Sequence, residues 1–411
     1  MRILIVAYAC EPGKGSEQGT GWNLAVQLAA SHEVTVVTRA NNQEVIEQVL
    51  TGRDDLKLSF IYHDLSEQML RLKKRSFFPV QLYYALWLKS VSSMMREGNR
   101  MGGFDVVHHL TFNSFEIPPL FLGETSARKL WGPIGGGQIA PESLTSTLGR
   151  IARWKEKMRG WRVLRSAKNG KIQEVLRKCD SVLFANEETR DLLGQYCTGR
   201  TDVMVDVGVD SDQFEPSVEA GEGNRVLFAG KFEHRKGSRL LLKAFWEAVK
   251  KNSKLSLRMV GDGPEWEMEK AWVREHGLDE VIELPGRRTH AEMAQEFADA
   301  DIFVFPSLRD TTGAIALEAM ASEVPTVCLD HQGARLMVDE KSGIRVTVES
   351  EEETIKGMAE AIVRLSDDAE MRSEMGKRSR ERVKELFSWE SKVERLLEEY
   401  QAITEKPEKV D

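Results

Sequence analysis

Short apolar runs alternate with helical stretches along the first half of the chain. After the first run comes a glycine-rich loop, and in the following segment, 22–30, apolar residues recur at helical spacing. Strands that alternate with helices form a parallel sheet with helices on both faces. The pattern therefore predicts a doubly wound α/β domain with strands at 3–7, 33–38, 56–62, 106–110, 130–133 and 181–186.

The same alternation starts again after a segment, 201–224, that is rich in Asp, Glu and Gly. Helices are expected at 238–250 and 314–321, and a charged helical tail is interrupted at Ser388, a suitable N-cap. We therefore expect an α/β fold of two Rossmann-like doubly wound domains that face a cleft, with domains at 1–203 and 204–388. The strands of the second domain are expected at 226–229, 255–260, 281–284, 302–305 and 324–329.

Composition narrows the class of protein. A chain of 411 residues with 41% hydrophobic and 30% charged residues fits a folded protein of two domains. The net charge of -8 argues against a nucleic-acid partner. The four cysteines have neither metal-site nor redox spacing, and no apolar window reaches the ~20 residues of a membrane span. These features favour a cytoplasmic protein.

Candidate chemistry in the first domain follows its predicted strands. Gly13 and Gly15 lie in a loop before a helix, where free backbone N–H groups attract phosphate, although the spacing is not a dinucleotide fingerprint. His108 and His109 end a strand, so neighbouring side chains point to opposite faces and one of them is expected to meet a ligand. A flexible loop and a structural histidine are the alternative interpretations.

The second domain carries stronger signals. The loop 230–237 places three cations at a helix start, an arrangement that suits a diphosphate. In the segment 306–321, Thr311 or Thr312 is a candidate helix cap, and Gly313 lets a ligand approach. Glu318 lies inside an otherwise apolar helix, so its carboxylate needs a partner, which is either a ribose or a nearby Arg or Lys.

Four motifs of the second half occur in a specific order. They are Gly230-Lys231 with Lys236-Gly237, Val260-Gly261-Asp262-Gly263-Pro264, Pro306-Ser307 with Asp310, and Leu317-Glu318-Ala319-Met320-Ala321. Together they resemble glycosyltransferase family four, the group 1 retaining glycosyltransferases with the GT-B fold. The resemblance covers nearly the whole chain. It implies that the helix 389–411 returns to complete an acceptor-binding first domain.

The resemblance implies donor contacts residue by residue. Lys231, where the family usually has Arg, and Lys236 would contact the diphosphate, and Glu318 would bind the ribose hydroxyls. Asp310 would face the hexose. The remaining donor contacts would come from Gly13, Gly15, Arg287, Thr312, Gly313 and Ala314.

The resemblance also implies catalytic and acceptor contacts. The catalytic set is His109, Lys231, Lys236 and Asp310, and the acceptor-binding set is Glu17, His108, Gly135 and Gly136. Gly135 and Gly136 belong to a run of three glycines that lets a backbone approach a ligand closely, and a plain mobile loop is the alternative. Transfer would retain the anomeric configuration by front-face attack, without a metal or a cofactor, and the nucleotide-diphosphate sugar would be the donor. Asp210-Ser211-Asp212 looks like a metal motif, but the residues around it resemble the family's interdomain segment.

Two departures from the family pattern concern the hexose. Asp310 is one methylene shorter than the usual Glu, and His108-His109 replaces two histidines separated by one residue. The alternatives are a non-catalytic nucleotide-sugar-binding protein, an epimerase or a phosphorylase on the same fold, and an oxidoreductase. The missing dinucleotide fingerprint disfavours the oxidoreductase.

Two basic stretches qualify the acidic net charge. The segment 150–178 has eleven basic residues against two glutamates, with Trp154 and Trp161 among them. The segment 71–100 adds cations and aromatic residues that include Lys74, Arg75, Phe77 and Phe78. Basic residues with aromatic anchors suit an anionic membrane surface, at the inner face of a membrane, or a lipid-linked acceptor. A solvated face over buried aromatic residues is the alternative.

Overall fold

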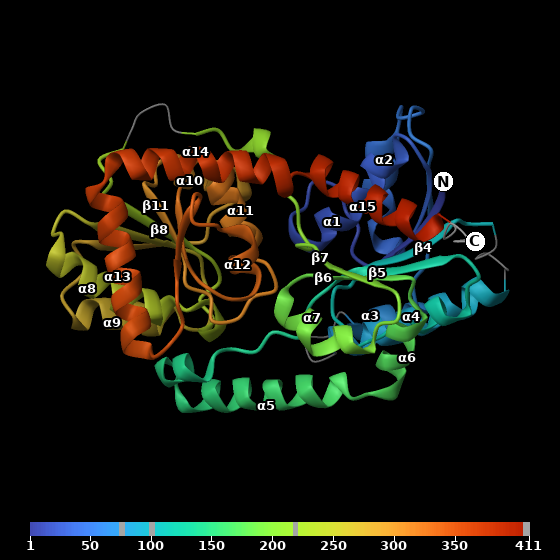
Figure 1. Cartoon of the computed structure of the whole chain (residues 1–411), viewed down its shortest axis with the longest axis horizontal. Coiled ribbons are helices and arrows are strands. Elements are labelled where there is room, and N and C mark those ends of the chain that lie inside the picture. Colours follow the sequence, from blue (N-terminus) through green and yellow to red (C-terminus); the bar gives the residue numbers. More distant parts are fainter. Residues whose placement is uncertain (74–78, 98–102, 217–220, 406–411) are drawn as a thin grey trace, which may run out of the picture. The chain divides into compact units, whose positions relative to one another are not determined.

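The computed structural model describes residues 1–73, 79–97, 103–216 and 221–405. It divides into two units, each built on one sheet (Figure 1). Unit 1 comprises Met1–Gly137, Arg162–Gly208 and Trp389–Asp411, and unit 2 comprises Gln138–Trp161 and Val209–Ser388. Lys74, Arg75, Phe77 and Phe78 of the basic stretch lie outside the described residues.

Unit 1 has a seven-stranded parallel sheet in the order β3-β2-β1-β4-β5-β6-β7. Its strands are β1 (Arg2–Ala7), β2 (Glu33–Thr38), β3 (Leu58–Tyr62), β4 (Val106–Thr111), β5 (Arg128–Ile134), β6 (Ser181–Phe184) and β7 (Arg200–Val203). Its helices are α1 (Ser16–Ala29), α2 (Gln43–Leu50), α3 (Glu67–Lys73), α4 (Val80–Glu97), α6 (Gly170–Lys178), α7 (Glu187–Leu193) and α15 (Trp389–Thr404).

Both faces of this sheet are buried, as the continuous apolar strands predict. Ile3 and Ile5 of β1 pack with α1, α2 and α15, whereas Leu4 and Val6 pack with α4 and α6. The alternation follows from the period of two along a strand. In α15, Leu396 and Tyr400 are fully buried in the core that contains Ile3 and Ile5, so this helix is part of unit 1.

Unit 2 has a six-stranded parallel sheet in the order β10-β9-β8-β11-β12-β13. Its strands are β8 (Arg225–Ala229), β9 (Ser256–Val260), β10 (Ile282–Gly286), β11 (Ile302–Phe305), β12 (Thr326–Leu329) and β13 (Gly343–Val346). Its helices are α8 (Ser238–Lys251), α9 (Trp266–Glu275), α10 (His290–Ala298), α11 (Ala314–Ala321), α12 (Gln332–Met337), α13 (Glu351–Asp367) and α14 (Ala369–Leu386). The helix α5 (Arg150–Ala167) begins in unit 2 and ends in unit 1.

The segment 138–161 differs from the predicted domains. The sequence assigned it to the first domain, but Ala140, Leu144 and Leu148 pack into the core of unit 2 beside α8 and α13. These apolar side chains are covered by a sheet formed more than 75 residues later in the chain. Each unit thus has one doubly wound parallel sheet, as the sequence predicts.

Candidate functional site

The loops that follow β8, β9, β10 and β11 lie at the carboxyl edge of the sheet in unit 2. This is the edge at which open parallel sheets bind ligands. Two of the loops, 230–237 and 306–313, contact each other. A side chain added at Gly237 would overlap the carbonyl oxygen of Pro306.

Two helices start at this edge without a side-chain cap. The residue before α8 is Gly237, with φ 73°, and the residue before α11 is Gly313, with φ 101°. A Cβ at position 313 would overlap the ring of Phe305, so only glycine fits this turn. The prediction that Thr311 or Thr312 caps α11 is therefore wrong, because Gly313 separates both threonines from the helix. Uncapped N–H groups at two helix starts favour an anion.

Lys236 and Asp310 lie together between these helix starts. The Lys236 ammonium donates to the Asp310 carboxylate, and the Arg235 guanidinium lies 3.6 Å from the other oxygen of Asp310. The amide N–H of Asp310 donates to Gln332 Oε1 at 2.8 Å. Lys236, which is predicted to contact the diphosphate, and Asp310, which is predicted to face the hexose, are thus neighbours in one hydrogen-bonded group.

Lys231 and Arg287 lie at the exposed margin of the same edge. The Lys231 ammonium pairs with Glu233 at 2.6 Å, and Glu233 also accepts from Arg235 at 2.9 Å. The loop cations Lys231, Arg235 and Lys236 thus face the carboxylates of Glu233 and Asp310, which leaves one net positive charge. Arg287 is exposed directly after β10.

Glu318 lies in the second turn of α11, with a side chain that is 16% exposed. Burial raises the pKa of its carboxyl, and the His290 imidazole, 4.0 Å away at the start of α10, opposes that rise. Within the part of the chain that the structure describes, no Arg or Lys pairs with Glu318. A largely buried acid with only a distant histidine beside it is able to accept hydrogen bonds from a ligand.

Three residues that the sequence did not single out hold the loops of this edge. Gln138 donates to Thr311 Oγ1 at 2.8 Å, and Gln332 donates to the carbonyl of Ile139 at 3.0 Å. Glu156 of α5 accepts two hydrogen bonds from Arg309 and one from His234, all at 2.9 Å. Burial alone would raise the pKa of Glu156, but these hydrogen bonds lower it to about 2. No local pattern marks these residues, since the partners in these bonds lie 78 or more positions away in sequence.

The glycines before α1 in unit 1 have different roles. Gly13, with φ 68°, and Gly15 are exposed, and a Cβ at either position would meet no atom within 4 Å. Gly19 and Gly21 lie inside α1, where a Cβ would overlap the carbonyl oxygens of Lys14 and Ala9. Gly13 and Gly15, which are predicted to approach the diphosphate, thus lie in open space at the uncapped start of α1. Gly19 and Gly21 instead allow close packing of the helix.

Glu17, in the first turn of α1, is hydrogen-bonded to the loop that follows β4. Its carboxylate accepts from the backbone N–H of Asn113 at 2.8 Å, and the Asn113 side chain donates to Asp206. Burial raises the pKa of Glu17 to about 7; the Asn113 hydrogen bond opposes this shift and the charge of Asp206 adds to it. The predicted acceptor contact is thus a carboxyl that titrates near neutral pH.

His108 and His109 point to opposite faces of β4, as predicted, but both are buried, at 0% and 1% exposure. His108 bonds the Tyr400 hydroxyl and the carbonyl of Gly132, both at 2.6 Å. His109 bonds the Tyr84 hydroxyl at 2.8 Å through Nε2, while its Nδ1 has no partner among the described residues. Burial lowers the pKa of His108 to about 4 and that of His109 to about 3, so both rings are neutral at pH 7. A contact between either ring and a sugar stays a prediction.

Gly135 and Gly136 follow β5 in an ordered turn. Gly135 is buried, and its N–H donates to the carbonyl of Asn113 at 2.6 Å, while Phe115 N–H donates back at 3.3 Å. Gly136 has φ 97°. The alternative of a plain flexible loop therefore does not fit Gly135, whose backbone is paired. The acceptor role of both glycines stays a prediction.

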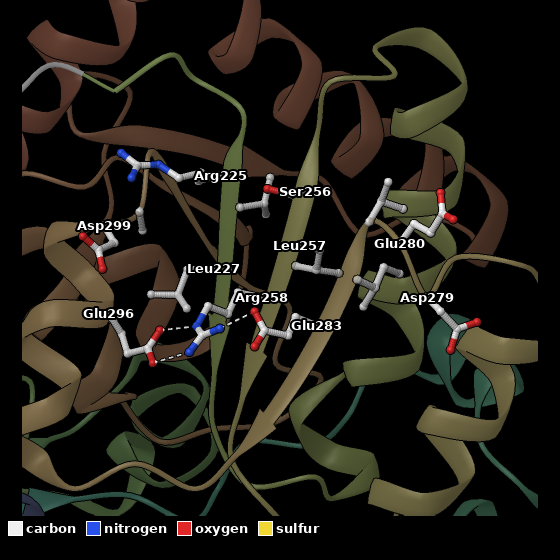
Figure 2. A pocket seen from close by; sticks show the side chains of 14 residues that line it. Arg225, Leu227, Ser256, Leu257, Arg258, Asp279, Glu280, Glu283, Glu296 and Asp299 are labelled. Atoms are coloured by element: carbon white, nitrogen blue, oxygen red, sulfur yellow. Dashed lines mark hydrogen bonds and ion pairs between the residues drawn. The ribbon is translucent and has the colours of Figure 1, made fainter.

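A cavity of about 420 Å³ lies in unit 2 away from these loops (Figure 2). It is lined by the first residues of β8, β9 and β10, the amino ends of the strands. Arg258 lies between Glu296, which it bonds at 2.5 and 2.9 Å, and Glu283. These three charges thus pair with one another inside the cavity.

Two classes of site are not found in the described ranges. No group of three or more His, Cys, Asp or Glu side chains could hold a metal ion in residues 1–73, 79–97, 103–216 and 221–405. Asp210 caps the short helix Ser211–Gln213 by accepting from Asp212 N–H. Over the same ranges, no helix has the length and apolar character needed to cross a bilayer.

Residues 209–382, which carry the uncapped helix starts, Lys236 and Glu318, match the family of glycosyl transferases group 1. This segment is a group 1 glycosyltransferase domain. Curated proteins with similar sequences are glycosyltransferases as well. A D-inositol 3-phosphate glycosyltransferase from Corynebacterium kroppenstedtii is 27% identical over 251 residues, which is 56% of this chain and 54% of that protein.

A second relative is the putative colanic acid biosynthesis glycosyltransferase WcaL of Escherichia coli, 25% identical over 53% of this chain and 55% of that protein. The chain thus spans about half the length of the curated relatives it matches.

Solved structures share the fold of both units, the GT-B fold. Sucrose-phosphate synthase from Thermosynechococcus elongatus has a TM-score of 0.68 with 18% identity, and the similarity covers 98% of each chain. HepE from Anabaena, solved in complex with UDP, has a TM-score of 0.62 with 16% identity over 98% of this chain and 100% of that one. At such identities the similarity is one of fold.

Proposed function

We propose that the protein is a retaining glycosyltransferase. It transfers a hexosyl group from a nucleotide-diphosphate sugar to a saccharide or lipid-linked acceptor, without a metal or a cofactor. Its biological role is the synthesis of a cell-envelope or extracellular polysaccharide, at the cytoplasmic side of a membrane. The colanic acid relative and the glycosyltransferase domain support this class of reaction.

One observation supports the donor site above all others. At the carboxyl edge of unit 2, two uncapped helix starts and Lys236 lie on one side, and the Glu318 carboxylate without an Arg or Lys partner lies one turn further along α11. A nucleotide-diphosphate sugar carries both matching groups, since its diphosphate is anionic and its ribose hydroxyls donate hydrogen bonds. In this proposal the diphosphate also competes with Asp310 for Lys236.

The proposed chemistry depends on the leaving group. As the glycosidic bond breaks, negative charge grows on the diphosphate, and the Lys236 ammonium and the N–H groups of α8 and α11 stabilise that charge. Asp310, the carboxylate of the loop, is bound by Lys236 and Arg235, so it orients the hexose rather than attacking it. The acceptor hydroxyl attacks from the side of the leaving phosphate, which takes up its proton, and the configuration is retained.

The test is nucleotide release from a panel of UDP-, GDP- and ADP-sugars, with UDP-glucose first because UDP is the ligand in the HepE structure. Release is measured with and without saccharide and lipid-linked acceptors, in the presence of a chelator. We expect release that depends on the acceptor and resists the chelator, with an α-linked product from an α-linked donor. A product of inverted configuration would exclude the retaining mechanism.

A non-catalytic nucleotide-sugar-binding protein is the second candidate, because Asp310 replaces the longer acid of the family. Binding of a nucleotide sugar without release under any acceptor would favour it. An epimerase on the same fold would instead convert the sugar without an acceptor. Analysis of the sugar recovered from the same reactions distinguishes these outcomes.

A further inference from the structure

The helix α5 has one buried face and one exposed face. Glu156, Gly160, Val163 and Ala167 are buried, at the spacing of three and four residues that defines one side of a helix. Large apolar side chains occupy the opposite side at the same spacing. They are Ile151, Trp154, Met158, Trp161 and Leu164, with 72%, 63%, 42%, 55% and 50% of their surface exposed.

The exposed side is also strongly cationic. Glu156 is the single acid in α5, and it is buried against Arg309 and His234. The exposed part of the helix therefore carries positive charge and no negative charge. Its exposed cations are Arg150, Arg153, Lys155, Lys157, Arg162 and Arg165, of which Arg162 pairs with Glu116 at 3.0 Å.

This combination matches an anionic bilayer surface. Exposed tryptophans bury their rings at the level of the lipid headgroups, and Lys and Arg bind the phosphates while their apolar stems lie along the acyl boundary. At 1.5 Å per residue, α5 is about 27 Å long, which is enough to lie along the membrane surface. Lysines, which are depleted in protein interfaces, and a lack of exposed acids in the helix favour a lipid surface over a protein partner. We propose that the exposed face of α5, from Ile151 to Leu164, docks the protein on an anionic lipid surface.

The buried face of α5 connects this surface to the candidate donor site. Glu156 binds Arg309, next to Asp310, and His234, next to Arg235, so the helix supports both loops of that site. Docking through α5 would therefore hold these loops near the membrane. If the proposed function is correct, this is where a lipid-linked acceptor is found. Docking itself does not depend on the reaction.

The test measures partitioning of the full-length protein onto two kinds of vesicle, one of phosphatidylcholine alone and one with about a third phosphatidylglycerol. We expect binding to the anionic vesicles only, weakening as salt rises. Neutralisation of two exposed cations by Lys155→Gln with Lys157→Gln should lower the partition constant about 25-fold, at about fivefold for each cation. Trp154→Ser with Trp161→Ser should lower it at least about tenfold.

Matched controls separate this face from exposed residues in general. Met268→Ser with Leu386→Ser removes apolar side chains of similar exposure, 51% and 48%, from other helices and should leave partitioning unchanged. Lys356→Gln with Lys377→Gln removes exposed cations of α13 and α14 and should likewise leave partitioning unchanged. Trp154→Phe with Trp161→Phe should keep binding within about threefold but lose most quenching of tryptophan fluorescence by brominated lipid.

Equal recovery of the wild type with and without anionic vesicles would overturn the proposal, as would unchanged partitioning of the tryptophan variant. A dimer that dissociates on Trp154→Ser with Trp161→Ser, without vesicle binding, would assign the face to a second copy instead. Nucleotide release with a soluble acceptor should be the same in wild type and α5 variants without vesicles. A failure of docking is therefore distinct from a failure of the proposed function.

Discussion

Replacing Glu17 by Gln should change how the stability of the protein depends on pH. In the folded protein, burial raises the pKa of Glu17 to about 7, compared with an ordinary value of 4.5. Between these values the folded state holds a proton that the unfolded state has lost. The contribution of the protonated carboxyl to the free energy of unfolding is therefore fully present below pH 4.5 and is lost as pH rises through 7.

The magnitude follows from the two pKa values. Each unit of difference is worth about 1.36 kcal/mol, so the full effect is about 3 kcal/mol, of which about 2.5 kcal/mol falls between pH 5 and pH 8. The amide of Gln stays neutral over this range, and its oxygen can still accept from Asn113 N–H. Relative to the wild type, Glu17→Gln should therefore gain about 2.5 kcal/mol in free energy of unfolding between pH 5 and pH 8.

The assay is urea unfolding of wild type and variant at a series of pH values, followed by circular dichroism and tryptophan fluorescence. Taking the difference between the two proteins removes the titration of all other groups. Glu44→Gln, on the exposed side of α2, measures the effect of removing a surface charge. A difference between Glu17→Gln and wild type that stays constant from pH 5 to pH 8 would refute the argument that burial keeps this carboxyl protonated.

Two further substitutions test the support of the donor loops. Glu156→Ala leaves Arg309 and His234 without their carboxylate and should lower the free energy of unfolding in urea by about 3 kcal/mol, whereas Glu156→Gln should lower it less. Equal stability of the wild type and both variants would contradict a stabilising role for these bonds. Gly313→Ala should weaken nucleotide binding and stability together, because the new Cβ overlaps the Phe305 ring, whereas Gly277→Ala, at φ 65° with open space, should cost only about 1 kcal/mol in thermal unfolding. Equal losses in the two alanine variants would show that overlap is not the cause.

The sequence predicted both sheets because most of their strands are continuous apolar runs. Two strands, β7 and β13, were not predicted, and the reason is physical. In β7, Arg200, Thr201 and Asp202 are exposed, so this edge strand has no apolar signal. In β13, the other edge strand, Gly343 and Arg345 interrupt the apolar pattern. Propensity and pattern carry little information for such short elements at the edge of a sheet.

Some residues of the candidate site could likewise be predicted from the sequence, and others could not. Lys236, Gly313 and Glu318 were predicted from motifs, because each is placed by the loop or helix in which it lies. The support of these loops by Gln138, Glu156 and Gln332 depends on pairs distant in sequence, which local pattern does not reveal. The burial of both histidines likewise depends on Tyr84 and Tyr400, the latter 292 positions from His108.

The most direct test of the donor site is the affinity for UDP of wild type and Glu318→Gln, measured by calorimetry. The carboxylate in its largely buried position should contribute about 1.5–3 kcal/mol through hydrogen bonds to the ribose, so the variant should bind about 10- to 100-fold more weakly. Glu267→Gln, on the exposed side of α9, should bind UDP as the wild type does. Equal affinity of wild type and Glu318→Gln would contradict the assignment of Glu318 as the ribose contact, and with it the donor site proposed for unit 2.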